Sequence, residues 1–183
     1  MIRFPKPLIG IVAFSGTGKT TLLKKLIPIL NGHGLRAGVV KHAHHSFDID
    51  HPGKDSYELR HAGASQVAVA SRERIAWIRE YKDDRDDTTL MDALSALDIS
   101  HLDLVIVEGF KHENFPKIEL HRPSLGRPLL CSQDRNIIAL ASDAPVDAAP
   151  DIAQLDLNDA NTIADFIISN MNTGNDDEPV YAA

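Results

Sequence analysis

The segment Ala13–Thr20, with the sequence AFSGTGKT, constrains the fold of this chain more than any other feature. It follows the phosphate-loop pattern GxxxxGK[ST], with alanine in place of the first glycine. The apolar run Leu8–Ala13 before it predicts a buried strand, and the leucine and isoleucine spacing over Lys19–Leu30 predicts a helix. A turn from a strand into a helix directs backbone N–H groups and the helix dipole at a phosphate. The segment therefore predicts a phosphate-binding loop in an α/β protein, although an ordinary glycine-rich turn has the same composition.

The residue types in this loop suggest separate roles. Gly16 and Gly18 permit the unusual dihedral angles and the close backbone approach that a phosphate cradle needs. Lys19 would reach the β- and γ-phosphates as a catalytic cation, and the Thr20 hydroxyl would bind Mg²⁺. The expected nucleotide-binding residues are Ser15, Gly16, Thr17, Gly18, Lys19, Thr20, Thr21 and Asp143.

The order of the remaining patterns predicts a P-loop NTPase fold, with a mostly parallel sheet flanked by helices and a β-hairpin extension. One nucleotide-binding domain over residues 1–172 and a flexible acidic tail over 173–183 are expected. The expected strands are Leu8–Ala13, Arg36–Lys41, Val67–Ser71, Arg74–Glu80, Leu104–Val107, Lys117–His121 and Ile137–Ala141. The expected helices are Lys19–Leu30, with Pro28 as a kink or in its last turn, Ser56–Ala64, Thr88–Leu97 and Asn158–Met171.

Charge and cysteine content exclude several classes of protein. Residues 1–82 hold 13 Lys and Arg against 6 Asp and Glu, whereas residues 83–183 hold 6 against 20. The acidic second half argues against a role on nucleic acid, but a local anionic ligand suits the basic first half. Cys131 is the single cysteine of the 183 residues, so no internal disulfide can form. No apolar run has the length of a membrane helix, and a cytoplasmic location is expected.

Two acidic residues follow predicted strands. Glu108 comes directly after the apolar strand Leu104–Val107, where it would serve as a catalytic residue near Mg²⁺ or its water ligand. Asp143 follows Ile137–Ala141 and could accept from guanine N1 and N2, although the usual NKxD sequence is absent. A loop or helix-capping aspartate is an equal alternative for Asp143.

The segment Lys41–Ser56 contains four His, three Asp and two Lys. A polar loop after the second strand is a natural switch region beside a γ-phosphate. Asp50 is assigned to nucleotide-linked Mg²⁺, and the alternative is a solvated connector. The candidates for a second, anionic ligand or a switch are His42, His44, His45, Asp48, Lys54 and Arg60.

The segment Ile75–Ile78 (IAWI) is apolar at every position, although alternate side chains of a strand point to opposite faces. A small hairpin cannot cover both faces by itself. We therefore expect a homodimer that uses the Val67–Glu80 hairpin, with a mid-sheet position inside the monomer as the alternative.

Three segments together resemble the molybdopterin-guanine dinucleotide biosynthesis protein B (MobB) family. They are SGTGKTTLLKKLIP, KHAHHSFDIDHPGKDSYELRHAGA and LVIVEGFKHENFPKIELHR, and the resemblance covers most of residues 8–143. It implies a small GTP-binding protein with GTP and Mg²⁺ as ligands, weak GTPase activity and a homodimeric state. It also implies an adapter role beside the molybdopterin guanylyltransferase, with molybdopterin as a further partner. By resemblance, Glu108 and Lys111 belong to a nucleotide-sensing region.

Two other functions remain open from the sequence. A metal-insertion GTPase would use His and Cys clusters, and the lone Cys131 argues against it. A small-molecule P-loop kinase would need an arginine-rich lid, yet the charges between Asp83 and Leu102 are mostly acidic.

Overall fold

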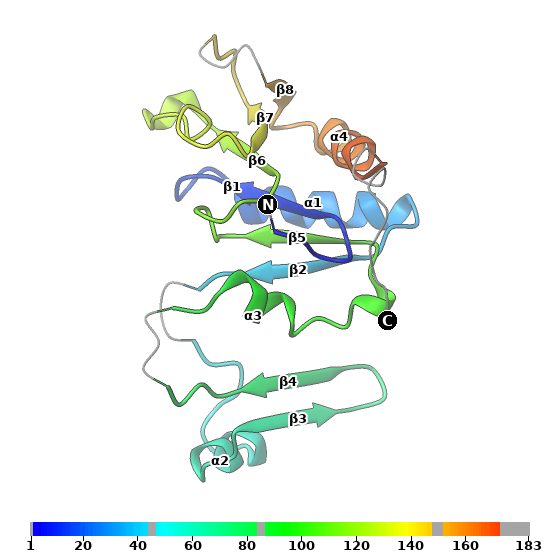
Figure 1. Ribbon diagram of the computed structural model, residues 1–183, viewed down its shortest axis with the longest axis vertical. Helices are drawn as coiled ribbons and strands as arrows, with labels where there is room; N and C mark the ends of the chain where they lie inside the picture. Colours follow the sequence, from blue (N-terminus) through cyan, green and yellow to red (C-terminus); the bar gives the residue numbers. More distant parts are fainter. Residues whose placement is uncertain (1, 44–46, 84–86, 148–151, 173–183) are drawn as a thin grey trace. The chain divides into compact units, whose positions relative to one another are not determined.

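The computed structural model describes residues 2–43, 47–83, 87–147 and 152–172 (Figure 1). The chain divides into two compact units, Met1–His42 with Thr89–Ala183, here called the sheet unit, and Ala43–Thr88, here called the hairpin unit. The sequence predicts one domain over this span, and its expected tail at 173–183 lies outside the described residues.

The sheet unit is built on six parallel strands in the order β2-β5-β1-β6-β7-β8. The strands are β1 (Leu8–Val12), β2 (Ala37–Lys41), β5 (Leu104–Glu108), β6 (Lys117–His121), β7 (Ile137–Ser142) and β8 (Ala153–Asp156). The continuous apolar runs of β1 and β5 suit strands that are buried on both faces. The predicted α/β class with a parallel sheet is confirmed.

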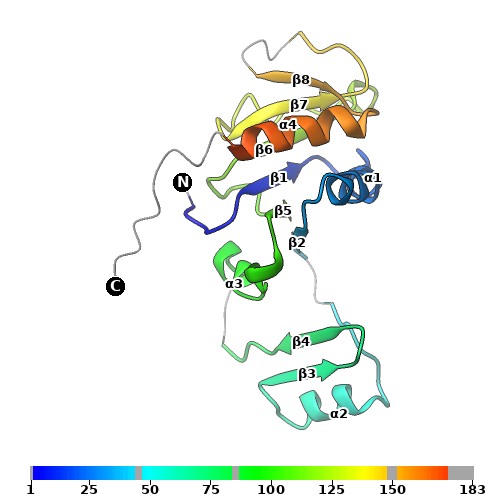
Figure 2. The same ribbon diagram turned by 90° about the vertical axis from the view of Figure 1, so that its right-hand side faces the viewer.

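Two layers of helices cover this sheet (Figure 2). Helices α1 (Lys19–Gly32) and α4 (Ala160–Asn172) pack on one face, where Leu26, Leu30 and Ile163 are fully buried. The short helix α3 (Leu90–Leu94) packs its two leucines on the other face. Two 3₁₀ turns, η1 (Ile99–His101) and η2 (Pro123–Leu125), complete this unit. No helix among the described residues is long and apolar enough to cross a membrane.

The hairpin unit contains α2 (Asp55–His61) and the antiparallel strands β3 (Gln66–Ala70) and β4 (Ile75–Arg79). These strands pair with each other in a separate two-stranded sheet, so the alternative of a mid-sheet position is wrong. The predicted hairpin extension is confirmed.

Several predicted boundaries differ from the structure. The predicted helix Thr88–Leu97 spans only Leu90–Leu94, and a capping box between Thr89 and Asp92 sets its start. Helix α1 continues past Pro28 and the predicted end at Leu30, as far as Gly32. The sequence does not predict strand β8, because its residues AQLD lack an apolar run and its pairing with β7 is a tertiary contact.

Strand β6 buries three ionisable side chains on the sheet face opposite α1 and α4. Ile118 and Leu120 join the α1–α4 core, whereas the alternate residues Lys117, Glu119 and His121 are 0%, 1% and 7% exposed. The Lys117 ammonium donates to Asp134 Oδ2 at 2.8 Å and to the Glu113 carbonyl, and it lies 4.9 Å from the Phe115 ring centroid. Glu119 accepts from the backbone N–H groups of Leu130 and Cys131, both at 2.8 Å. Each buried charge thus holds a loop in place.

Replacing Lys117 by methionine should destabilise the fold by about 3 kcal/mol, because Asp134 loses its cation. This value is at the low end of the range because the Asp134 side chain is 23% exposed and can rehydrate. Adding Asp134→Asn should recover much of the loss, since no uncompensated charge then remains. Urea unfolding of the three variants measures this. A double variant no more stable than Lys117→Met would contradict the assigned pairing.

Candidate functional site

The turn between β1 and α1 has the backbone conformation that a phosphate loop requires. Gly16 has φ +83° and Gly18 has φ +109°, both in the left-handed region that favours glycine. A Cβ at Gly16 would meet no atom within 4 Å, so backbone strain rather than space demands glycine there. Gly18 is the N-cap of α1, and no side chain caps the first turn of this helix. Its N–H groups and positive dipole end therefore have no side-chain anion of their own.

The loop side chains hold the turn in shape. Lys19 Nζ donates to the carbonyl oxygens of Ala13 at 3.1 Å and Phe14 at 3.3 Å. Thr17 is buried, and its hydroxyl donates to the Phe14 carbonyl at 2.9 Å. Ser15, Gly16, Thr20 and Thr21 are exposed. The ammonium thus rests on neutral acceptors that an anionic phosphate oxygen could replace.

Glu108 lies at the carboxyl end of β5, next to the strand that leads into the loop. The parallel register pairs it with Ile11 on one side and Lys41 on the other. Its side chain is 14% exposed, and Oε1 lies 3.8 Å from Lys41 Nζ. The Lys41 side chain is mostly exposed, so this ion pair contributes little to stability.

The residues after Glu108 form a tight junction with His42. The His42 N–H donates to the Glu108 carbonyl at 2.8 Å, and the His42 and Phe110 rings stack with centroids 4.5 Å apart. A Cβ at Gly109, which has φ +98°, would lie 2.5 Å from the His42 Cβ. This junction therefore needs glycine, and it fixes where the chain leaves β5 toward Lys111, which is exposed.

Arg122, which sequence reasoning missed, connects two predicted nucleotide-binding residues. It follows β6, donates from Nε to the Thr17 carbonyl at 2.9 Å and forms an ion pair with Asp143. Its guanidinium also lies 3.8 Å from where a Cβ on Gly18 would be. The signal that could have revealed it is its place directly after a buried strand, where parallel sheets collect their site residues. The predicted base contact of Asp143 stays a prediction.

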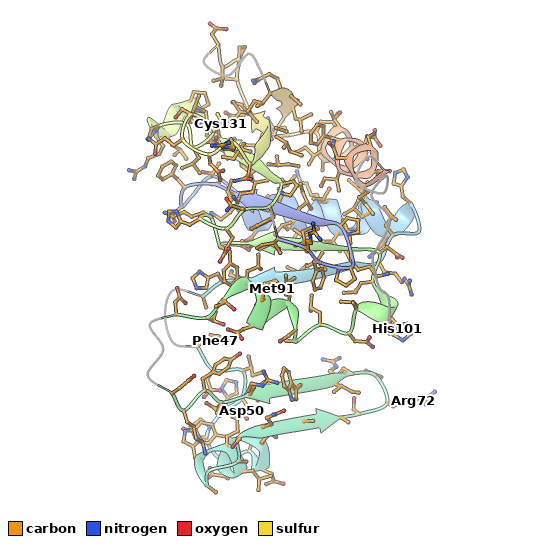
Figure 3. All side chains as sticks on the ribbon, viewed as in Figure 1. Phe47, Asp50, Arg72, Met91, His101 and Cys131 are labelled. Carbon is orange, nitrogen blue, oxygen red and sulfur yellow. The ribbon has the colours of Figure 1, made fainter. Side chains whose placement is uncertain are left out.

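In the hairpin unit, three carboxylates surround one arginine. The Arg60 side chain is 8% exposed and pairs with Asp48 at 2.6 Å, with Asp50 and with Glu80. The pKa of Arg60 is raised by its hydrogen bonds to Asp50, Glu80 and Asp48. Asp50, labelled in Figure 3, is predicted to serve Mg²⁺ and instead pairs with Arg60, which is predicted to meet an anion.

The remaining predicted residues of the segment Lys41–Ser56 are Lys54, His44 and His45. Lys54 is exposed at the N-terminal boundary of α2. His44 and His45 lie outside the described residues. Across the described ranges, no three His, Cys, Asp or Glu side chains gather in an arrangement that could hold a metal ion.

Burial and the neighbouring Glu119 carboxylate raise the pKa of the Cys131 thiol to about 11, so the thiol is neutral at physiological pH.

The strand order, the glycine-shaped turn between β1 and α1, and the acid ending β5 define a P-loop protein of the α/β class. The family model described as "Molybdopterin guanine dinucleotide synthesis protein B" (MobB) matches residues 8–143. The chain belongs to this family.

Relatives in sequence and in structure agree. The molybdopterin-guanine dinucleotide biosynthesis adapter protein of Escherichia coli is 51% identical over 170 residues, which cover 92% of this chain and 95% of that protein. The adapter protein of Haemophilus influenzae is 44% identical over 162 residues, or 88% and 87% of the two chains. A crystal structure of molybdopterin-guanine biosynthesis protein B superimposes with a TM-score of 0.67 at 30% identity, over 88% of this chain and 98% of that chain. A Bacillus stearothermophilus MobB homologue gives 0.65 at 25% identity, over 91% and 98%.

The contact between Arg60 and Asp48 predicts a pH effect. The hydrogen bond from Arg60 lowers the pKa of Asp48 to about 2. A lowered pKa means that this contact stabilises the fold above pH ~4 and is lost as the pH falls from ~4 to ~2. In Arg60→Gln the pKa of Asp48 should rise toward ~3.9, its ordinary value. A carboxyl-carbon NMR titration measures it, with Arg72→Gln in the hairpin turn as the control. An unchanged Asp48 titration in Arg60→Gln would disprove the contact.

Proposed function

We propose that this protein is a GTP-binding adapter with weak GTPase activity in molybdopterin-guanine dinucleotide biosynthesis. The observation that carries the proposal is the turn between β1 and α1, in which the Lys19 ammonium donates to the Ala13 and Phe14 carbonyl groups of the same turn. The pathway comes from the family and from the names of the relatives at 51% and 44% identity.

The residues present fit a nucleoside triphosphate with Mg²⁺. The uncapped first turn of α1 offers N–H donors to the β-phosphate, and Lys19 would exchange two carbonyl acceptors for phosphate oxygens. The exposed Thr20 hydroxyl would ligate Mg²⁺, and Glu108 would hold one of its water ligands. Bound Mg²⁺ would neutralise charge on the phosphate oxygens.

These residues support slow hydrolysis. Lys19 would stabilise the negative charge that develops on the phosphate oxygens, while Glu108 would orient water near the metal. Neither of these roles removes a proton from the attacking water. Electrostatic stabilisation with little general-base help is consistent with a weak GTPase.

Guanine selectivity would depend on Asp143. Its carboxylate pairs with Arg122, so accepting from guanine N1 and N2 would require it to share or exchange that partner. Arg122 would keep its bond to the Thr17 carbonyl and stay beside the phosphates. Adenine has an acceptor at N1 and no amino group at C2, so a carboxylate that accepts from N1 and N2 would favour GTP over ATP.

The hairpin unit supports a homodimer. Among its described residues no apolar side chain is buried, and Val69, Ile75 and Trp77 are 47%, 75% and 37% exposed. The register places Val69 opposite Ala76 and Ile75 opposite Ala70, on alternate faces of the hairpin. A two-stranded sheet with apolar residues on both faces and open edges needs a partner surface. We propose that a second copy supplies it and that the assembled adapter binds molybdopterin guanylyltransferase.

Replacing Lys19 by alanine should weaken GTP binding roughly 10- to 100-fold, because the lost bonds are charge-assisted. The melting temperature should stay close to wild type, since Lys19 fills no core position. Calorimetric titration with GTP and Mg²⁺ measures this, with Lys24→Ala on the exposed side of α1 as the matched control. Unchanged GTP affinity in Lys19→Ala would reject the phosphate-loop assignment.

ATP displacing GTP at equal concentration would reject the guanine preference.

The double variant Ile75→Lys with Trp77→Lys should be monomeric, because two buried ammonium groups would face the apolar partner surface. Multi-angle light scattering should give 20.1 kDa for this variant and twice that mass for wild type. Glu73→Lys, in the hairpin turn, changes charge without entering either strand and should remain a dimer. A monomeric wild-type protein at micromolar concentration would rule out the dimer.

A further inference from the structure

The register of two neighbouring strands brings Arg122 and Asp143 together. His121, the last residue of β6, pairs with Ser142, the last residue of β7, so the residues that follow them leave the sheet side by side. The two charged residues are 21 positions apart in sequence, and their ion pair therefore depends on the sheet. They lie at the edge where parallel sheets bind their ligands.

The Arg122 guanidinium divides its donors between two neighbours. Nε donates to the Thr17 carbonyl of the phosphate loop at 2.9 Å, and Nη1 donates to Asp143 Oδ2. Nη2 makes no hydrogen bond with any residue in the described ranges, and it lies 3.8 Å from where a Cβ on Gly18 would be. Gly18 is the N-cap of α1, so this donor lies beside the helix end that is proposed to bind the β-phosphate.

Asp143 pairs with a group whose donors resemble those of guanine. A guanidinium and the N1–C2–N2 edge of guanine both present N–H donors from one planar unit, which suits a carboxylate acceptor. Within the described ranges, Arg122 is the one cation paired with Asp143. A guanine edge on Asp143 would therefore take the position that the guanidinium holds.

This replacement changes the charge balance at Asp143. Guanine is neutral, so a carboxylate that exchanges Arg122 for guanine loses a cation. A phosphate at the first turn of α1 would give the guanidinium a new anion, through Nη2. The Arg122 and Asp143 side chains are 32% and 23% exposed, so water already screens their pairing and the pair can be broken at modest cost. A ligand with both a guanine edge and phosphates compensates both charges.

We propose that Arg122 is a specificity-determining residue that competes with guanine for Asp143 and contacts a phosphate once guanine has displaced it. Adenine, which lacks the two donors, leaves Arg122 on Asp143. Guanine binding thus adds a phosphate contact that adenine binding does not, and the discrimination exceeds that of the base contact alone. This inference deepens the proposed function, on which it rests, by naming a residue that sets its selectivity.

The first test compares guanosine with GDP, on the wild-type protein and on Arg122→Gln. Guanosine should bind roughly three- to tenfold more tightly to the variant, because the base no longer displaces a cation. GDP should gain less than guanosine, since it loses the Arg122 contact to its phosphate. Ligand-observed NMR competition measures both affinities. An equal change for the two ligands, or guanosine that binds no more tightly to Arg122→Gln than to wild type, would overturn the proposal.

Two further variants separate the exchange from a general loss of charge. Arg127→Gln removes a cation from the same β6–β7 connection, where the guanidinium lies 5.8 Å from the Phe14 ring centroid, and it should bind guanosine like wild type. In an Asp143→Asn protein, adding Arg122→Gln should no longer tighten guanosine, since the carboxylate is gone. A gain of similar size in either protein would contradict the exchange.

Side-chain NMR of the wild-type protein follows the exchange without any substitution. Saturating GDP should shift the Asp143 carboxyl-carbon signal and the Arg122 Nη1–H signals together, whereas ADP, with the same phosphates, should leave both nearly unchanged. Unshifted signals with GDP, or equal shifts with both nucleotides, would reject the exchange. If Lys19→Ala still lost GTP, the proposed function would stand without it, whereas retention of GTP by Lys19→Ala would reject the phosphate loop itself.

Discussion

The parallel pairing of all six strands in the sheet unit is the constraint on which the candidate site depends. Parallel strands end at one edge, so residues that are distant in sequence must meet there. The loop after β1, Glu108 at the end of β5, Arg122 after β6 and Asp143 after β7 all occupy that edge. No single motif carries this arrangement, because four different strands, β1, β5, β6 and β7, lead into it and the sheet provides the geometry.

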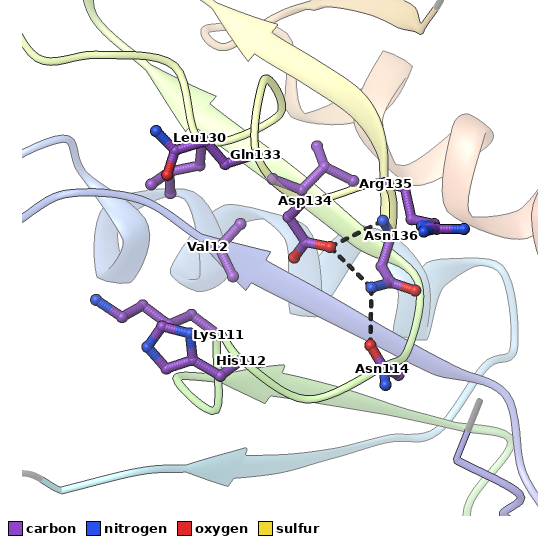
Figure 4. Close-up of a pocket in the computed structure, with 10 residues that line it drawn as sticks. Val12, Lys111, His112, Asn114, Leu130, Gln133, Asp134, Arg135 and Asn136 are labelled. Carbon is purple, nitrogen blue, oxygen red and sulfur yellow. Dashed lines mark hydrogen bonds between the residues drawn. The ribbon is translucent and has the colours of Figure 1, made fainter.

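The sequence predicts those parts of the fold that local patterns specify. The apolar runs Leu8–Val12 and Leu104–Val107 and the glycine loop before α1 can be predicted from their own residues alone. Strand β8 and the role of Arg122 depend on which neighbours the topology brings, and no periodicity reports that. The loop residues 130–136 have no pattern either, so the pocket that several of them line together with Val12 and Lys111 is visible only in the structure (Figure 4).

The hairpin unit illustrates a different limit. Composition alone predicts metal binding by its acidic residues. In the structure Asp48 and Asp50 share Arg60, ten or twelve residues away in sequence, with Glu80 from beyond β4. Metal binding and structural ion pairing use the same carboxylate residues. Only the neighbouring group in the structure, here Arg60, distinguishes the two roles. The predicted metal role of Asp50 would have to compete with this pairing.

The link from Thr17 through Arg122 to Asp143 has a thermodynamic consequence. The Arg122 guanidinium binds both the phosphate loop and Asp143 in the loop after β7. A ligand that competes with Arg122 for Asp143 therefore also changes the free energy of the hydrogen bond between Arg122 and the Thr17 carbonyl. Linkage is reciprocal: occupancy of the turn must alter affinity at Asp143 by the same factor. The contacts to the phosphates and to the base of a bound nucleotide would therefore be energetically coupled. The binding free energy of the whole nucleotide would then differ from the sum for a ligand that carries only the phosphates and one that carries only the base.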